Sequence, residues 1–293
     1  MNRRQCLAVL SAASAEFAVH AAPQTRVIGA QTYQIRGPMR REPTRILKTI
    51  AGFGYRELEV HSRQALATVA PVLKDVGLTV RSCMVETPLF TANWDSFPDL
   101  KQVTVEEVAD NLASVGVEYM LLGDIPAGAR GDGEDFFRRT ADRLNVAADK
   151  ARKSGVKVAW QNRGYEFEGR PGRRPIDFYK ERLDGKLVGM ELDTFWAAMV
   201  AVDPVKLMKD WKGRVSGLRL NDRAKGVKPG FEAPGQGAFA EAGQGDLDFP
   251  AVLKAAAAAG VRVYSTGQEL VEGDPLEGLR RNFEYFKLGT GVG

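Results

Sequence analysis

The chain has 293 residues, of which 44% are hydrophobic and 27% are charged, and this balance excludes a disordered protein and permits a large buried core. Lysine and arginine exceed aspartate and glutamate by 41 to 37, and these charges are interspersed rather than gathered in one run. The small positive excess is therefore typical of a solvated surface, and no pattern for binding nucleic acid is present.

The first 21 residues have the pattern of an export signal. Arg3 and Arg4 precede a weakly apolar run that ends in small residues at Ala21, and the arginine pair resembles that of a twin-arginine signal. We predict a signal over residues 1–21, a periplasmic protein that meets no membrane after cleavage, and a folded domain over residues 26–289. A buried first helix is the alternative. Cleavage would leave Cys83 as the only cysteine, and no intramolecular disulfide could then form.

Beyond the signal the chain repeats one theme, an amphipathic helix that ends at a glycine and is followed by a short run rich in valine, isoleucine and leucine. A first strand, RVIGAQTY, precedes the repeats, and LVGMELD supplies the sixth strand. The other joints are IAGFGYRELEV, LKDVGLTVRSCMV, LASVGVEYMLL, ARKSGVKVAW, WKGRVSGLRL and AAAAGVRVYS. Eight strands that alternate with helices predict an α/β fold, a single-domain (β/α)8 TIM barrel. A doubly wound open sheet would need a glycine-rich phosphate turn near the start, and the sequence has none there.

In such a barrel the functional side chains lie at the carboxyl ends of the strands, and alternate residues of each strand point inward. The inward polar residues predicted by this alternation are Glu57, Glu59, His61, Gln161, Arg163, Glu191, Asp193, Arg219, Asn221, Ser265 and Glu269. Buried charges without partners are costly, so a ring of this kind needs water, a substrate or ion pairs. A closed network of structural ion pairs, such as Asp193 with Arg219, is the alternative interpretation.

Aromatic and glycine-rich segments follow several of these strands. Trp94 and Trp196 lie in positions where an aromatic face could pack on a sugar ring or a planar ligand, whereas Trp160 should face the helices. Glycine-rich runs over residues 128–136 and 225–246 are long for a barrel. We expect the second run to be a lid or a partner-contacting loop, with a solvent loop as the alternative.

The order and spacing of these segments resemble the xylose isomerase-like barrels of the sugar phosphate isomerase/epimerase superfamily, from about Val27 to Phe286. The similar motifs are GAQTYQIR, GYRELEV, QNRGYEF, ELDTFWA, LRLND and GQGDLDFPAVL. Relatives of this kind usually hold one divalent cation with a ligand from each of strands 5, 6, 7 and 8.

The resemblance places those four ligand positions on Gln161, Asp193, Arg219 and Gly267, of which only Asp193 is a competent ligand. It therefore implies a dismantled metal site, and we expect neither a metal nor another cofactor. The alternative is a carboxylate site built from Glu57, Glu59, Asp193 and Glu269, which the charges of two neighbouring arginines would disfavour.

Without the cation, the guanidinium of Arg219 could stabilise an enolate or hold a carboxylate or phenolate. The general base would be Asp193, Glu59 or Glu57, and His61 would be a proton shuttle unless it is structural. The predicted substrate-binding residues are Gln161, Arg163, Tyr33, Trp196, Asn221 and Glu269. Because polar groups at the barrel mouth contribute less to stability than the core, we expect Arg219→Ala to lose most activity or ligand affinity and to leave the fold largely intact.

Two classes of function follow from this site. The first is a metal-independent isomerase, epimerase or carbon–oxygen lyase that transfers a proton on a small carbonyl, sugar-derived or aromatic substrate. The second is a non-catalytic protein that binds a sugar or another small ligand. Retention of carboxylates beside two arginines favours the enzyme. The expected partner is a small molecule, and the sequence does not decide between a monomer and a homo-oligomer.

Overall fold

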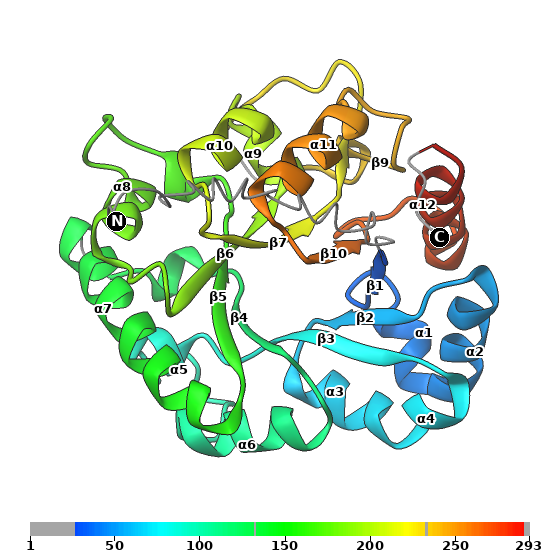
Figure 1. Cartoon of the computed structure of the whole chain (residues 1–293), viewed down its shortest axis with the longest axis horizontal. Helices are drawn as coiled ribbons and strands as arrows, with labels where there is room; N and C mark the ends of the chain where they lie inside the picture. The colour runs from blue at the N-terminus through cyan, green and yellow to red at the C-terminus, as the bar shows by residue number, and fades with distance from the viewer. Residues whose placement is uncertain (1–26, 132, 232–233, 290–293) are drawn as a thin grey trace, which may run out of the picture.

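The computed structural model describes residues 27–131, 133–231 and 234–289 (Figure 1). The predicted export signal over residues 1–21 lies outside these residues. Across the ranges that the structure describes, no helix combines the length and apolar character needed to cross a membrane.

Eight parallel strands close into a barrel in the order β1-β10-β7-β6-β5-β4-β3-β2, and this confirms the predicted single-domain (β/α)8 fold. The barrel strands are β1 (Gly29–Gln31), β2 (Glu57–Val60), β3 (Thr79–Met84), β4 (Tyr119–Leu122), β5 (Lys157–Gln161), β6 (Val188–Asp193), β7 (Val215–Arg219) and β10 (Val263–Thr266). Two further strands, β8 (Asp222–Arg223) and β9 (Phe239–Ala240), form a small antiparallel pair in the segment after β7.

The helices surround the barrel on its outer side (Figure 1). They are α1 (Arg36–Arg41), α2 (Pro43–Phe53), α3 (Arg63–Val69), α4 (Leu73–Val76), α5 (Pro88–Thr91), α6 (Val105–Ser114), α7 (Gly133–Ala151), α8 (Pro175–Arg182), α9 (Thr194–Met199), α10 (Pro204–Asp210), α11 (Phe249–Ala259) and α12 (Pro275–Gly289). Short 3-10 turns are η1 (Ala70–Val72), η2 (Ala127–Ala129), η3 (Arg152–Ser154), η4 (Tyr165–Phe167) and η5 (Gln236–Ala238).

Local chemistry at the helix ends explains the repeated helix, glycine and strand pattern. Thr104 and Glu107 form a reciprocal capping box that starts α6. Gly54 ends α2 with a φ of 116°, a conformation that side chains disfavour, and a Cβ on it would fall 2.3 Å from the ring of Phe283. Glycine at this joint is therefore required both by the backbone and by the packing of α12 on α2.

The apolar core has an outer layer between strands and helices and a smaller cluster inside the barrel. Trp160 belongs to the outer layer, as predicted, and its ring packs 4.8 Å from Tyr179 and 5.6 Å from Trp211. The inner cluster consists of Tyr119, Leu121, Ala159 and Val263. These four residues fill the barrel towards the amino ends of the strands, and the polar residues are left at the carboxyl ends.

The glycine-rich run over residues 225–246 is partly ordered by Asp222. Its carboxylate accepts hydrogen bonds from the backbone N–H groups of Gly243 at 3.0 Å, Gly245 at 3.0 Å and Leu247 at 3.1 Å. Phe231 from the same run reaches the cavity described next. The role of residues 225–246 as a lid or as a partner-contacting loop stays a prediction.

Candidate active site

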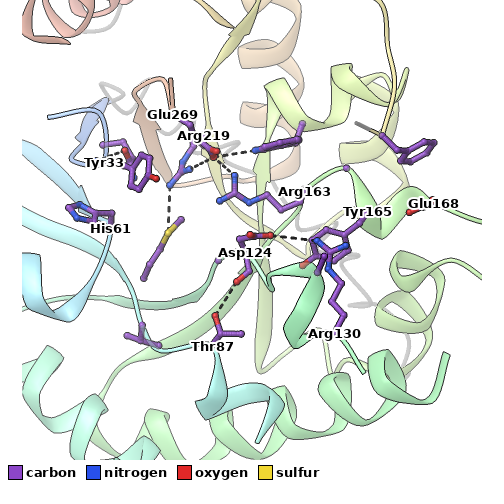
Figure 2. Close-up of a pocket in the computed structure, with 18 residues that line it drawn as sticks. Tyr33, His61, Thr87, Asp124, Arg130, Arg163, Tyr165, Glu168, Arg219 and Glu269 are labelled. Carbon is purple, nitrogen blue, oxygen red and sulfur yellow. Dashed lines mark hydrogen bonds and ion pairs between the residues drawn. The ribbon is translucent and has the colours of Figure 1, made fainter. Parts of the chain in front are cut away.

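A cavity of about 620 Å³ opens at the carboxyl ends of the barrel strands (Figure 2). Its charged side chains are Arg130, Arg163 and Arg219 together with Asp124, Glu168 and Glu269. Its aromatic side chains are Tyr33, Tyr165, Trp196 and Phe231. The cavity therefore offers balanced charge and several aromatic faces, a combination suited to a polar ligand with one apolar side.

Arg219 ends β7 and is 1% exposed, yet its guanidinium reaches the cavity. Its Nε donates to Oε1 of Glu59 at 3.0 Å, and its Nη2 donates to the same oxygen. Its Nη1 lies 3.4 Å from Oε1 of Glu269 and 3.8 Å from Oδ2 of Asp193. Burial opposes the charge, but the surrounding carboxylates hold the pKa of Arg219 above its ordinary value. Arg219 is thus a permanent cation at the centre of the site.

Glu59 and Glu191 lie inside the barrel beneath Arg219, and only Glu59 pairs with it. Glu59 also accepts hydrogen bonds from Ser265 at 2.9 Å and Ser82 at 3.3 Å. Burial raises the pKa of Glu59, but the charge of Arg219 and hydrogen bonds with Glu191, Arg219 and Ser265 lower it by more, so the net shift is downwards. Burial and the neighbouring Glu59 raise the pKa of Glu191 well above its usual range. Of these two carboxyl groups, Glu59 is therefore the more acidic and Glu191 the one that favours the proton.

Asp193 is fully buried at the end of β6, where it caps α9. Its Oδ1 accepts from the backbone N–H groups of Phe195 at 3.0 Å and Trp196 at 3.2 Å, and its Oδ2 accepts from Asn221 at 3.3 Å. Burial raises the pKa of Asp193 to about 7, against the opposing effect of Arg219. Asp193 does not line the cavity. Its contacts instead allow it to hold the turn between β6 and α9 and the guanidinium of Arg219 in place.

Glu269 is the carboxylate that both lines the cavity and contacts the central arginines. It accepts from Arg163, from Nη1 of Arg219 at 3.4 Å and from Nε1 of Trp196 at 3.2 Å. Burial raises the pKa of Glu269, but the charges of Arg163 and Arg219 lower it by more than burial raises it. Glu269 is therefore ionised at neutral pH. Nε of Arg163 is buried and has no hydrogen-bond partner among the described residues.

His61 follows β2 on another wall of the cavity (Figure 2). Its Nδ1 lies 2.8 Å from the hydroxyl of Thr32, and its ring meets that of Tyr33 edge-on with 5.7 Å between the centroids. Burial and the charges of Arg36 and Arg40 lower the pKa of His61 to about 4. The imidazole is consequently neutral at pH 7 and able to accept a proton.

Five predicted site residues do not line the cavity: Glu59 and Asp193, described above, and Glu57, Gln161 and Asn221. Glu57 starts β2 at the opposite, amino-terminal end of the strands, where it lies 3.5 Å from Arg81. Gln161 and Asn221 point inward but are buried, and their amides donate to the carboxylates of Glu191 and Asp193. The prediction that Glu57 is a base at the site is wrong, because its side chain lies at the other end of the barrel.

The structure adds cavity residues that the sequence analysis did not single out, chiefly Arg130 and Tyr165 from the segments after β4 and β5. The guanidinium of Arg130 stacks 3.5 Å from the centre of the Tyr165 ring, and it lies 4.0 Å from Asp124. The signals were present in the sequence as the GAR run and the tail of QNRGYEF, but neither indicates which side chains meet.

The four family ligand positions do not fit a divalent cation. At the seventh strand the guanidinium of Arg219 lies among carboxylates, where its charge would repel a metal ion. At the eighth strand Gly267 has no side chain, and a Cβ there would fall 2.9 Å from Cβ of Gln31. Within the described ranges no three histidine, cysteine, aspartate or glutamate side chains are grouped so that they could hold a metal.

The chain belongs to the xylose isomerase-like TIM barrel family, whose model matches residues 47–287. No curated protein matches it in sequence. Among solved structures, a sugar phosphate isomerase/epimerase from Parabacteroides distasonis ATCC 8503 is similar with a TM-score of 0.70 and 21% identity, over 94% of this chain and 98% of that one.

Two other solved structures share the fold at lower identity. The 3-keto-D-glucoside 4-epimerase from E. coli has a TM-score of 0.62 and 15% identity, over 89% of this chain and 99% of that one. The IOLI protein with a bound zinc atom has a TM-score of 0.69 and 14% identity, over 91% of this chain and 99% of that one. At these identities the similarity shows a common barrel architecture.

Proposed function

We propose that the protein is a metal-independent isomerase or epimerase that acts on a carbohydrate-derived substrate with a carbonyl group. The observation that carries this proposal is the guanidinium of Arg219, which lies at the seventh-strand ligand position and faces the cavity between Glu59 and Glu269. In this proposal Arg219 supplies the positive charge that a divalent cation supplies in many relatives.

The reaction would begin with removal of a proton next to the carbonyl, which leaves negative charge on the carbonyl oxygen. The side chains of Arg219 and Arg163 both line the cavity, and their guanidinium groups are fixed donors that can stabilise this charge. His61 is neutral and lines the cavity, so it is our first candidate for the base. Glu269, as an ionised carboxylate, is the second candidate.

Asp193 and Glu59 act in this scheme as positioning residues. Neither lines the cavity, both are buried, and each has one carboxylate oxygen within 4 Å of the guanidinium of Arg219. Glu59 holds the guanidinium from below, and Asp193 holds the turn that carries Trp196. This assignment replaces the expectation that Asp193 or Glu59 is itself the base.

A carbohydrate is supported as substrate class by the lining and by the comparisons. Tyr33, Tyr165 and Trp196 offer aromatic faces beside charged and amide groups, the pattern by which proteins contact the two sides of a sugar ring. The family name and the named activities of the similar structures also concern sugars.

Hydrogen exchange tests the proposal without knowledge of the product. The protein would be incubated in D2O with a panel of aldoses, ketoses and 3-keto-glucosides, and loss of the C–H signal beside the carbonyl would be followed by 1H NMR. We expect exchange by the unmodified protein, and a loss of at least about 100-fold in Arg219→Lys, which keeps the charge but loses the planar donor pair. Arg81→Gln, at the opposite end of the barrel, is the matched control and should exchange normally.

The two alternative functions, a carbon–oxygen lyase and a non-catalytic binding protein, give different results in the same assay. Appearance of a carbon–carbon double bond with release of a leaving group would identify a carbon–oxygen lyase. A sugar that quenches the fluorescence of the cavity residue Trp196, yet exchanges no hydrogen, would identify a binding protein and overturn the proposal.

A further inference from the structure

A second cavity of about 230 Å³ adjoins the main one and shares His61 with it. It lies between α1 and α3. Arg36 and Arg40 reach it from α1, and Gln64 and Thr68 reach it from α3. His61 therefore separates the candidate active site from a smaller compartment whose lining is mostly polar.

Among the residues that the structure describes, none that lines this second cavity carries a carboxylate. The arginines of the main cavity are compensated, since Arg219 pairs with Glu59, Arg163 pairs with Glu269 and Arg130 lies 4.0 Å from Asp124. By contrast, neither Arg36 nor Arg40 forms an ion pair with a carboxylate in the part of the chain that the structure describes. The second cavity consequently concentrates positive charge that the protein leaves uncompensated.

Arg36 is held in place rather than free in solvent. Its Nη1 donates to the carbonyl of Tyr33 at 2.8 Å, and its guanidinium stacks 3.9 Å from the centre of the Tyr33 ring. A guanidinium fixed by such contacts loses little freedom when it binds a ligand. The remaining donors of Arg36 and those of Arg40 are available to an acceptor in the cavity.

The charges of Arg36 and Arg40 lower the pKa of His61. After burial, Arg36 and Arg40 are the next largest causes that lower the pKa of this imidazole, ahead of Arg219. His61 therefore lies in a positive electrostatic potential between the two cavities. A bound anion would reduce this potential and raise the pKa of His61.

We propose that the cavity between α1 and α3 binds an oxyanion group, a carboxylate, phosphate or sulfate, through Arg36 and Arg40. Guanidinium groups form paired hydrogen bonds with planar or tetrahedral oxyanions, and Gln64 and Thr68 supply neutral donors beside them. The site is one of binding, so it does not depend on the proposed reaction. Because His61 borders both cavities, the oxyanion can be a free ion or the charged group of a ligand whose remainder lies in the main cavity.

The imidazole of His61 provides the test. The full chain has two histidines, so His20→Ala leaves His61 as the single imidazole signal for NMR in a protein purified without a histidine tag. Sodium sulfate and sodium phosphate would be titrated at pH 6 against sodium chloride of equal ionic strength. We expect a saturable shift of the His61 ring signals with both oxyanions, and a rise in its pKa of roughly one unit when sulfate is bound.

Variants separate a built site from general electrostatics. Arg40→Gln keeps the Tyr33 contact of Arg36 and should weaken sulfate binding at least about 10-fold. Arg36→Gln should do the same. Arg41→Gln removes an equal charge from the same helix but does not line the cavity, and it should leave binding unchanged. Absence of a saturable shift, or an equal loss in Arg41→Gln, would overturn the proposal.

Comparison of glucuronate with glucose distinguishes the source of the oxyanion. Glucuronate that shifts His61 and also quenches Trp196, with both effects weakened in Arg40→Gln, would assign the site to the charged group of a main-cavity ligand. Sulfate binding with no advantage of glucuronate over glucose would assign it to a free anion. Either result supports the oxyanion site. The site does not require that these variants lose hydrogen exchange, because it is independent of the proposed reaction.

Discussion

Arg219 of β7 and Glu59 of β2 form a buried ion pair across the mouth of the barrel, and each side chain is 1% exposed. Two other strands, β10 and β1, separate them in the sheet. The pair thus ties together distant parts of the barrel, while the opposite edge of the same guanidinium faces Glu269 and the cavity. A group placed in this way serves both the stability of the barrel mouth and the chemistry of the site.

Replacement of Arg219 should therefore destabilise the protein. Arg219→Gln leaves Glu59 as an uncompensated buried charge, and we expect the free energy of unfolding to fall by about 3–5 kcal/mol. This prediction differs from the expectation from sequence that Arg219→Ala would leave the fold largely intact, because the structure places the side chain in a buried ion pair. Urea unfolding measures the change.

The control for this experiment is Arg81→Gln at the other end of the barrel. Arg81 pairs with Glu57 and Glu118, and its side chain is 35% exposed, so its loss should cost about 1 kcal/mol or less. Equal destabilisation by the two substitutions would show that the buried ion pair of Arg219 contributes no more to stability than the exposed pairs of Arg81.

The sequence predicted the barrel well because the periodicity of each segment is local. Alternation also placed Glu59, Asp193 and Arg219 correctly on the inner face. Alternation does not, however, give the height of a residue along the barrel. Glu57 and Glu59 are two residues apart, roughly 7 Å along β2, and this distance is enough to place Glu57 beside Arg81 and Glu59 beside Arg219.

The cavity lining was harder to predict than the inner face. Gln161 and Asn221 point inward as predicted, but their amides are used to hold Glu191 and Asp193 beneath the surface of the cavity. Arg130 contacts Tyr165 from a different loop. Such pairings depend on side-chain packing between segments that are distant in sequence, and no local pattern encodes them.

The pH dependence of stability should carry a contribution from Glu166, which is buried behind the site. Burial raises its pKa to about 7. A carboxyl group whose folded pKa is raised contributes stability that is complete below its unfolded pKa and lost as the pH rises through the folded value. Relative to Glu166→Gln, the unmodified protein should therefore lose about 3 kcal/mol between about pH 3.5 and about pH 8, a range that brackets the unfolded and folded pKa values.

Chemical denaturation of both proteins across this pH range measures the difference. Glu168→Gln removes an exposed carboxylate two residues further along and is the control. Parallel stability curves for the unmodified protein and Glu166→Gln would mean that Glu166 is already ionised in the folded state, contrary to its burial.

The activity should also depend on pH through His61. Because burial lowers its pKa to about 4, the neutral imidazole is the main form from about pH 5 upwards, and kcat/KM should rise through pH 4 to a plateau. Arg40→Gln removes one of the charges that lower this pKa, so the acid limb should move to higher pH. A limb that is unmoved in Arg40→Gln would identify another group as the base.

Export remains a prediction about residues 1–21, which lie outside the described part of the chain. A fusion of residues 1–25 to a reporter should reach the periplasm, and replacement of Arg3 and Arg4 by lysine should sharply reduce transport. Lysine keeps the positive charge, which suffices for a general secretory signal. Transport that tolerates the two lysines would favour that general route.

Metal content is the most direct check on the exchange of a cation for a guanidinium. Gln161, Arg219 and Gly267 stand where ligands would be needed, and the charge of Arg219 alone would repel a divalent ion. We therefore expect elemental analysis of the purified protein to find no stoichiometric metal, and hydrogen exchange on the sugar panel to be unchanged by EDTA or by added magnesium, manganese or zinc. The charge argument makes the same prediction for Arg219→Lys, which retains the cation, so this variant should also bind no metal. One tightly bound metal ion per chain, with activity lost on its removal, would mean that the carboxylates around Arg219 rearrange to ligate it and that the guanidinium does not replace the cation.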